Sequence, residues 1–119
     1  MAYVKVCYHR IRLFGVPTPF LHTSLEVYDG KNASKVGFYP QGEGKNFLRL
    51  GPGEVRTEGA QSGRVVVVTR DAERTKALMK AVRDIVWARY HPLKKNCFHW
   101  RDAVLKRAGI AVPKDGWVG

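Results

Sequence analysis

Residues 94–100 read Lys-Lys-Asn-Cys-Phe-His-Trp and place a cysteine at the expected start of a helix. Asn96 is a favoured N-cap residue, apolar residues recur at helical spacing after Cys97, and Gly109 is a natural left-handed stop. Cys97 is then the first helical residue. The partial positive charge at a helix N-terminus, together with the two lysines before it, favours the thiolate. This segment therefore predicts a nucleophilic thiol at position 97.

The length and composition indicate one domain spanning residues 1–119. The 119 residues are 45% hydrophobic and 26% charged, which is typical of a soluble globular chain with a modest core. No segment approaches the roughly 18 apolar residues of a membrane span, and the N-terminal segment lacks the apolar core of a signal peptide. We expect a chain that is cytoplasmic as synthesised, with any export following a non-classical route.

The chain has only Cys7 and Cys97, too few for a disulfide scaffold. We expect free thiols in a reducing compartment, with a bridge between the two cysteines as the alternative. Four histidines and two cysteines at unrelated spacings give no zinc pattern, so neither a metal nor another cofactor is expected.

The formal net charge of +11 is unevenly distributed. Residues 1–60 carry 8 Lys and Arg against 5 Asp and Glu, and residues 61–119 carry 13 against 5. Such a surface attracts anionic polymers, including nucleic acid, anionic lipid headgroups and cell-wall polymers. The alternative is a basic surface that has no dedicated partner.

The N-terminal half predicts three strands. Residues 3–13 alternate in polarity, and in residues 20–28 Leu25 and Val27 share one face with Leu21 while His22 lies on the other. Residues 29–32 are a turn signal, and residues 34–39 form the returning strand of a hairpin that ends at Pro40.

The remaining segments predict a further strand and a long helix. Residues 41–63 are expected to be loops around one short strand at 47–50, and Gly42-Glu43-Gly44-Lys45-Asn46 is interpreted as a loop because it lacks the ending of a phosphate loop. The valine run 65–69 fits a strand covered on both faces. Asp71 is expected to cap a helix from Ala72 to about Tyr90.

A cysteine nucleophile needs a base, and His22 is the best candidate because a strand presents it rigidly. His9 stands among arginines, His91 precedes a proline, and His99 is only two residues from Cys97 on the same helix, where side chains do not face each other. Taken singly, a buried structural role is the commoner one for either a histidine or a cysteine. Their combination favours catalysis.

These features resemble the circularly permuted papain-like cysteine hydrolases, which include NlpC-type peptidases, PPPDE peptidases and lecithin retinol acyltransferase-like enzymes. The likeness covers about residues 20–113. It is carried by residues 21–27 (LHTSLEV), 37–40 (GFYP) and the segment from Tyr90 through NCFHW to Ile110. The histidine strand comes first and the cysteine helix last, as in that family. The resemblance implies an antiparallel sheet packed against two or more helices.

The family has a third polar residue that orients the histidine, and two residues could fill that role here. If the turn pairs Tyr28 with Ala33, then Tyr39 lies opposite His22 and Gln41 is a diagonal neighbour. Glu26 lies about 13 Å along the strand, too far for a direct bond. Backbone N–H groups at the start of the Cys97 helix are expected to form the oxyanion hole.

The expected function is hydrolysis of an amide bond by a dyad of Cys97 and His22. The resemblance implies peptides of the bacterial cell wall as substrate and an antibacterial effector that an inhibitor protein could control. Acyl transfer and thioester hydrolysis are compatible with the same dyad, because a fold does not choose the acyl group. A non-enzymatic basic module that binds nucleic acid is the alternative from another class.

Overall fold

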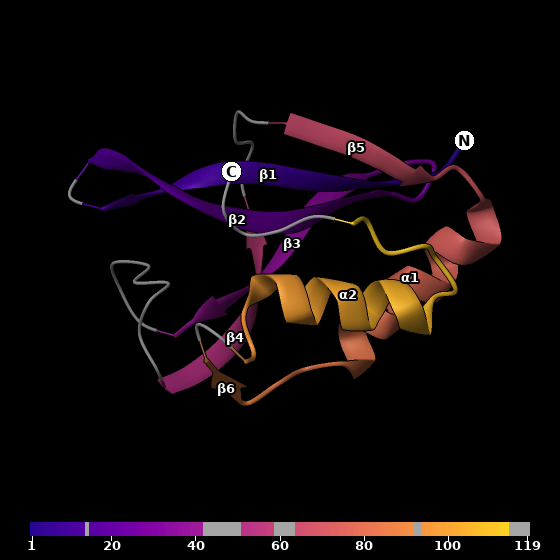
Figure 1. Cartoon of the computed structure of the whole chain (residues 1–119). Helices are drawn as coiled ribbons and strands as arrows, with labels where there is room; N and C mark the ends of the chain where they lie inside the picture. Colours follow the sequence, from indigo (N-terminus) through magenta and orange to yellow (C-terminus); the bar gives the residue numbers. More distant parts are fainter. Residues whose placement is uncertain (14, 42–50, 59–63, 92–93, 115–119) are drawn as a thin grey trace.

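The computed structural model describes residues 1–13, 15–41, 51–58, 64–91 and 94–114. In these residues a six-stranded antiparallel sheet, in the order β5-β1-β2-β3-β4-β6, packs against two helices (Figure 1). The strands are β1 (Tyr3–Leu13), β2 (Val16–Tyr28), β3 (Ala33–Pro40), β4 (Gly51–Glu58), β5 (Arg64–Thr69) and β6 (Arg89–Tyr90), and the helices are α1 (Ala72–Asp84) and α2 (Cys97–Arg107). The expected α+β class is confirmed.

The β2–β3 hairpin has the expected register. Tyr28 pairs with Ala33, and Asp29 closes the turn by accepting the N–H groups of Lys31 and Asn32, both at 2.8 Å. The pairing of β2 with β3 runs only from there to Leu25 and Val36, whereas β3 continues to Pro40 as the partner of β4. In Figure 1 the β1–β2 pair and the β3–β4 pair diverge beyond Leu25 and Val36, and α2 begins beside this point.

The strand β5 differs from the sequence-based expectation. It is the edge strand next to β1, and Val65, Val66 and Val67 are exposed by 50%, 40% and 38%. The expectation that this run is covered on both faces is therefore wrong. An apolar β-branched run has the same sequence pattern at the centre and at the edge of a sheet, so its periodicity could not separate the two.

The glycine-rich region between β3 and β5 contains a strand that the sequence pattern did not indicate. β4 occupies Gly51–Glu58, in a segment that we expected to be loop. The expected strand at 47–50 and the loop at 42–46 lie outside the described residues. Gly53 is one reason that the sequence of β4 resembles a loop. A glycine is required at this position in the strand, because a Cβ would overlap the Phe38 ring.

Helix α1 begins as expected and ends earlier than expected. The Asp71 side chain accepts the N–H of Arg74 at 2.9 Å, but the helix stops at Asp84 rather than near Tyr90. The Ile85 carbonyl then accepts the indole N–H of Trp100 at 2.8 Å, which holds the chain in a turn towards β6. The helix end is therefore fixed by a tertiary hydrogen bond that the local sequence does not show.

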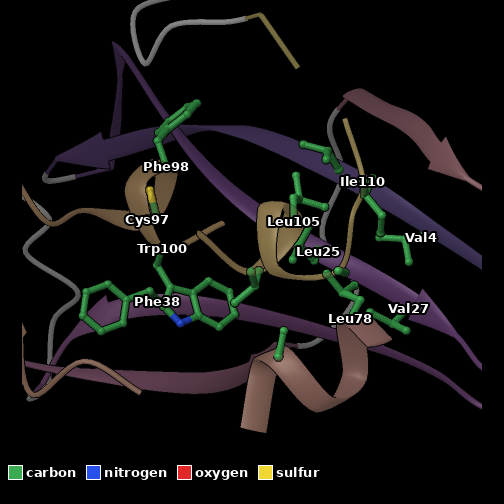
Figure 2. Packing of buried hydrophobic residues seen from close by; sticks show 14 of the residues in the cluster. Val4, Leu25, Val27, Phe38, Leu78, Cys97, Phe98, Trp100, Leu105 and Ile110 are labelled. Carbon is green, nitrogen blue, oxygen red and sulfur yellow. The ribbon is translucent and has the colours of Figure 1, made fainter. Parts of the chain in front are cut away.

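The core lies between the helices and one face of the sheet (Figure 2). Leu25 and Val27 of β2 face Leu78 of α1 and Leu105 of α2, so the aliphatic side of β2 is the side that the helices cover. Trp100 lies at the centre of this layer, with its ring 6.4 Å from that of Phe38. At this end of the core the helix α2 contacts β2 and β3.

Candidate functional site

Cys97 is the first residue of α2, as the sequence predicts. Asn96 accepts the N–H groups of Phe98 at 3.0 Å and His99 at 3.2 Å, and Nδ1 of His99 accepts the Asn96 N–H at 3.2 Å. This reciprocal capping box stabilises the helix start by about 1 kcal/mol. The cysteine is therefore held in a defined position by the residues on both sides of it.

The capping box changes the expected oxyanion hole. Two of the N–H groups at the start of α2, those of Phe98 and His99, donate to the Asn96 side chain. In this conformation those two groups are engaged, so they are not available to a reacting carbonyl oxygen. An oxyanion hole built from them would require the Asn96 side chain to move away.

The thiol of Cys97 lies in the core on the helix side of the sheet. Cys97 is only 3% exposed, and Cys7 is buried to a similar degree, at 5%. The two cysteines do not form a disulfide. Tyr90 lies close to Cys97: burial first, and the electrostatic interaction with Cys97 second, raise the pKa of the Tyr90 phenol well above its ordinary value of 10.0.

The imidazole of His22 projects from β2 on the side opposite to Thr23. Thr23 Oγ1 accepts a hydrogen bond from Nη1 of Arg101 on α2 at 3.3 Å, so Thr23 faces the helix. Side chains alternate along a strand, and His22 therefore faces away from this turn of α2. His22 is fully buried, and its ring contacts His9 at 4.8 Å and Tyr39 at 4.6 Å between centroids.

The structure thus brings His22 and Tyr39 together, as the hairpin register predicts, and it gives Cys97 a different set of neighbours. The ring contacts described for His22 come from β1 and β3, whereas Cys97 lies near Tyr90 and the start of α2. The sequence pattern places His22 on the face of β2 opposite its aliphatic residues, and in the structure the helices pack on the aliphatic face.

The described hydrogen bonds of Gln41 connect it to β4 and not to His22. Its backbone N–H donates to the Pro52 carbonyl at 2.8 Å, and its side-chain amide donates to the Gly53 carbonyl at 3.4 Å. These bonds fix the end of β3 against β4. The role of third catalytic residue for either Tyr39 or Gln41 stays a prediction.

His9 and Arg56, which were not selected for the site, lie on either side of the His22–Tyr39 contact, so that the four side chains form a row across the sheet. His9 pairs directly with His22 across β1 and β2, and the Arg56 guanidinium lies 5.2 Å from the Tyr39 ring centroid while it forms an ion pair with Glu54. Glu54 is the cross-strand partner of Tyr39. The register of the β1–β2 hairpin would have placed His9 opposite His22, but this register can be derived only when the position of the turn between the two strands is known.

Arg101 is the most unusual residue near Cys97, because it is a fully buried arginine. It lies one helical turn after Cys97 and donates two hydrogen bonds to Asp102, at 2.9 and 2.7 Å, besides the one to Thr23. Its guanidinium also lies 4.9 Å from the Phe98 ring centroid. Arg101 therefore ties the cysteine helix to the histidine strand.

In the described part of the chain, no three His, Cys, Asp or Glu side chains form a group that could hold a metal ion. None of the helices in the described ranges has the length and apolar character needed to span a bilayer. Comparisons with family models, with curated proteins and with solved structures find no match to this chain. The papain-like resemblance therefore rests on the residues quoted above.

Proposed function

We propose that the protein is a cysteine hydrolase of the permuted papain-like type, with Cys97 as the nucleophile and His22 as the base. The thiolate attacks an amide or ester carbonyl, the imidazolium donates its proton to the leaving group, and water hydrolyses the thioester. Bacterial cell-wall peptides are the proposed substrate. Transfer of the acyl group to a second acceptor is the variant reaction of the same intermediate.

The observation that carries this proposal is the common location of the two elements. Cys97 begins α2 beside the point where β2 and β3 part, and His22 and Tyr39 lie three residues beyond the last β2–β3 pair. Their chain neighbours Thr23 and Phe38 contact the first two turns of α2 through a hydrogen bond and a ring stack.

The proposal includes an opening step. His22 is fully buried and Cys97 nearly so, and the imidazole faces away from the second turn of α2. Substrate therefore reaches the thiol only when β2 and β3 separate further beyond Leu25 and Val36, and the same movement must bring the imidazole to Sγ. A proton transfer needs a heavy-atom distance of about 3 Å, directly or through one water.

Alkylation kinetics test the dyad without knowledge of the substrate. Iodoacetamide is expected to label Cys97 at least about tenfold faster than Cys7, since the two thiols are buried alike and the proposed dyad activates Cys97. His22→Ala is expected to slow the labelling of Cys97 to the rate of Cys7. Peptide mapping by mass spectrometry measures both rates in one sample.

His9→Ala is the matched control, because it removes an imidazole from the neighbouring strand. Equal labelling of the two cysteines, or equal slowing by His9→Ala and His22→Ala, would contradict the dyad. Incubation with purified cell-wall peptide fragments then tests the substrate by a mass change that Cys97→Ala abolishes. Acylation of an added amine or lipid without cleavage would move the assignment to an acyltransferase.

The distribution of exposed charge favours a second candidate function, the binding of anionic polymers without catalysis. Between residues 64 and 114, twelve Lys and Arg side chains are exposed, against three exposed acidic ones, and Arg101 is the only buried cation among the residues described there. The exposed cations are Arg64, Arg70, Arg74, Lys76, Lys80, Arg83, Arg89, Lys94, Lys95, Lys106, Arg107 and Lys114.

Binding of double-stranded DNA is expected to weaken steeply with salt, as counterion release dictates. A footprint of six phosphates predicts a loss of roughly 10³ in affinity between 50 and 200 mM salt. Cys97→Ala is expected to leave this binding unchanged, and Lys76→Glu combined with Lys80→Glu on α1 to weaken it. Fluorescence anisotropy at four salt concentrations measures the slope, and a flat slope would exclude this function.

A further inference from the structure

The strand β5 presents an apolar edge that the described residues leave partly exposed. Exposed large apolar residues are scattered elsewhere, at Met1, Val16 and Val86, but three lie consecutively at Val65, Val66 and Val67. β5 pairs with β1 on one side and ends the described sheet on the other. Edge strands of soluble proteins are normally protected by charges, prolines or a covering segment, and a bare apolar edge is a template for another strand.

Cations bound the apolar run at both ends. Arg64 is the first residue of β5, and Arg70 follows its last residue; both are exposed. The Arg64 guanidinium lies 4.6 Å from the Tyr8 ring centroid, which holds it beside the strand. Asp71 follows Arg70 in the chain, and its side chain is engaged in capping α1.

The charges select against a second copy of this chain as the occupant. An antiparallel pair of β5 strands centred on Val67 would put Arg64 of each copy opposite Arg70 of the other, and like charges directly opposite each other are destabilising. Each copy also carries a net charge of +11, so the approach of two copies is opposed over a long range. A strand with carboxylates at its ends meets neither penalty.

We infer that β5 is a docking edge for an extended segment of a partner protein that is apolar in its centre and acidic at both ends. The partner strand adds to the sheet beside β5 through backbone hydrogen bonds, its apolar side chains cover the exposed valines, and its carboxylates pair with Arg64 and Arg70. In strand addition of this kind, hydrogen bonds of the main chain provide the affinity and contacts of the side chains provide the specificity. This inference does not depend on the proposed catalytic function.

A fluorescent nine-residue peptide, Glu-Glu-Thr-Val-Thr-Val-Thr-Glu-Glu with blocked ends, probes this edge directly. We expect binding by fluorescence anisotropy, no binding of the same peptide with lysine in place of glutamate, and a loss of about tenfold or more when alternate peptide nitrogens are methylated. N-methylation removes the donors that strand addition requires but keeps the charge and the side chains.

Two charge reversals locate the binding. Arg70→Glu is expected to weaken binding of the acidic peptide about fivefold, whereas Arg89→Glu, on β6 at the opposite edge of the sheet, is expected to change it by less than about twofold. Both variants change the net charge equally, so their difference isolates the β5 edge.

Three results would overturn the inference. Equal binding of the N-methylated peptide would show that the backbone edge is not used, and equal weakening by both reversals would show a diffuse charge effect. A dimer in sedimentation equilibrium that the acidic peptide dissociates would identify a second copy as the occupant of this edge.

Discussion

Trp100→Ala is expected to destabilise the protein by about 3–5 kcal/mol, a large part of the 5–15 kcal/mol that holds a domain of this size folded. Trp100 is fully buried, stacks on Phe38 and donates its indole N–H to the Ile85 carbonyl. Truncation removes the largest side chain of the core, opens a cavity between α2 and the sheet, and leaves a carbonyl without its donor. Urea unfolding followed by far-UV circular dichroism measures the change.

Two further variants keep this prediction informative even if Trp100→Ala does not fold. Trp100→Phe keeps an aromatic ring but loses the hydrogen bond, so a smaller loss of about 1–2 kcal/mol is expected. Trp87→Ala is the matched control, because Trp87 also contacts Phe38, edge-on at 5.7 Å, but is only half buried. A loss from Trp87→Ala as large as that from Trp100→Ala would contradict the central role of Trp100.

Arg101→Ala is expected to cost about 3 kcal/mol, the lower end of the range for breaking a buried ion pair, because Asp102 is partly exposed and can regain water. The substitution removes the hydrogen bond to Thr23 and the guanidinium packed on Phe98. The polar link between α2 and β2 is then lost, and the apolar packing of Leu25 on Leu105 remains. Equilibrium unfolding in urea provides the measurement.

Substitutions of similar volume separate charge from packing at this site. Arg101→Met fills the same space without a charge to desolvate, so it is expected to cost less than Arg101→Ala. Arg101→Lys keeps the charge but cannot reproduce the forked donors of the guanidinium. Its loss of stability is therefore expected to be larger than that of Arg101→Met. A loss from Arg101→Met equal to that from Arg101→Ala would show that the hydrogen bonds, and not the packing, stabilise the contact.

Periodicity and turn chemistry were sufficient for the hairpins and the helix starts. Alternation over residues 20–28 and the Asp29 turn gave the register of β2 and β3, and Asp71 and Asn96 marked the first residues of α1 and α2. These are local signals, because each depends on the side chains of one segment. Local signals are the ones that a single sequence retains.

Elements that depend on distant contacts were not predictable. The end of α1 is set by the bond between Trp100 and Ile85, and the exposure of β5 depends on which strand lies beside it. The candidate site shows the same limit. His22 and Tyr39 meet because one hairpin joins them, whereas the relation of Cys97 to His22 depends on which face of the sheet receives α2.

Arg101 was missed although its position carried a signal. It falls on the same helical face as Cys97 and Leu105, four residues from each, two residues that are both buried. A cation within an apolar stripe is typically buried with a partner. Such an exception to the pattern is therefore a reason to look for a tertiary hydrogen bond.

Gly53 gives the glycine-rich segment an unexpected intolerance to change. Any larger residue there would displace the Phe38 ring, which packs on Tyr90 and Trp100 beside the cysteine. A segment that reads as a permissive linker thus contains a fixed position, and libraries that diversify β4 to alter the reactivity of the thiol must leave it unvaried.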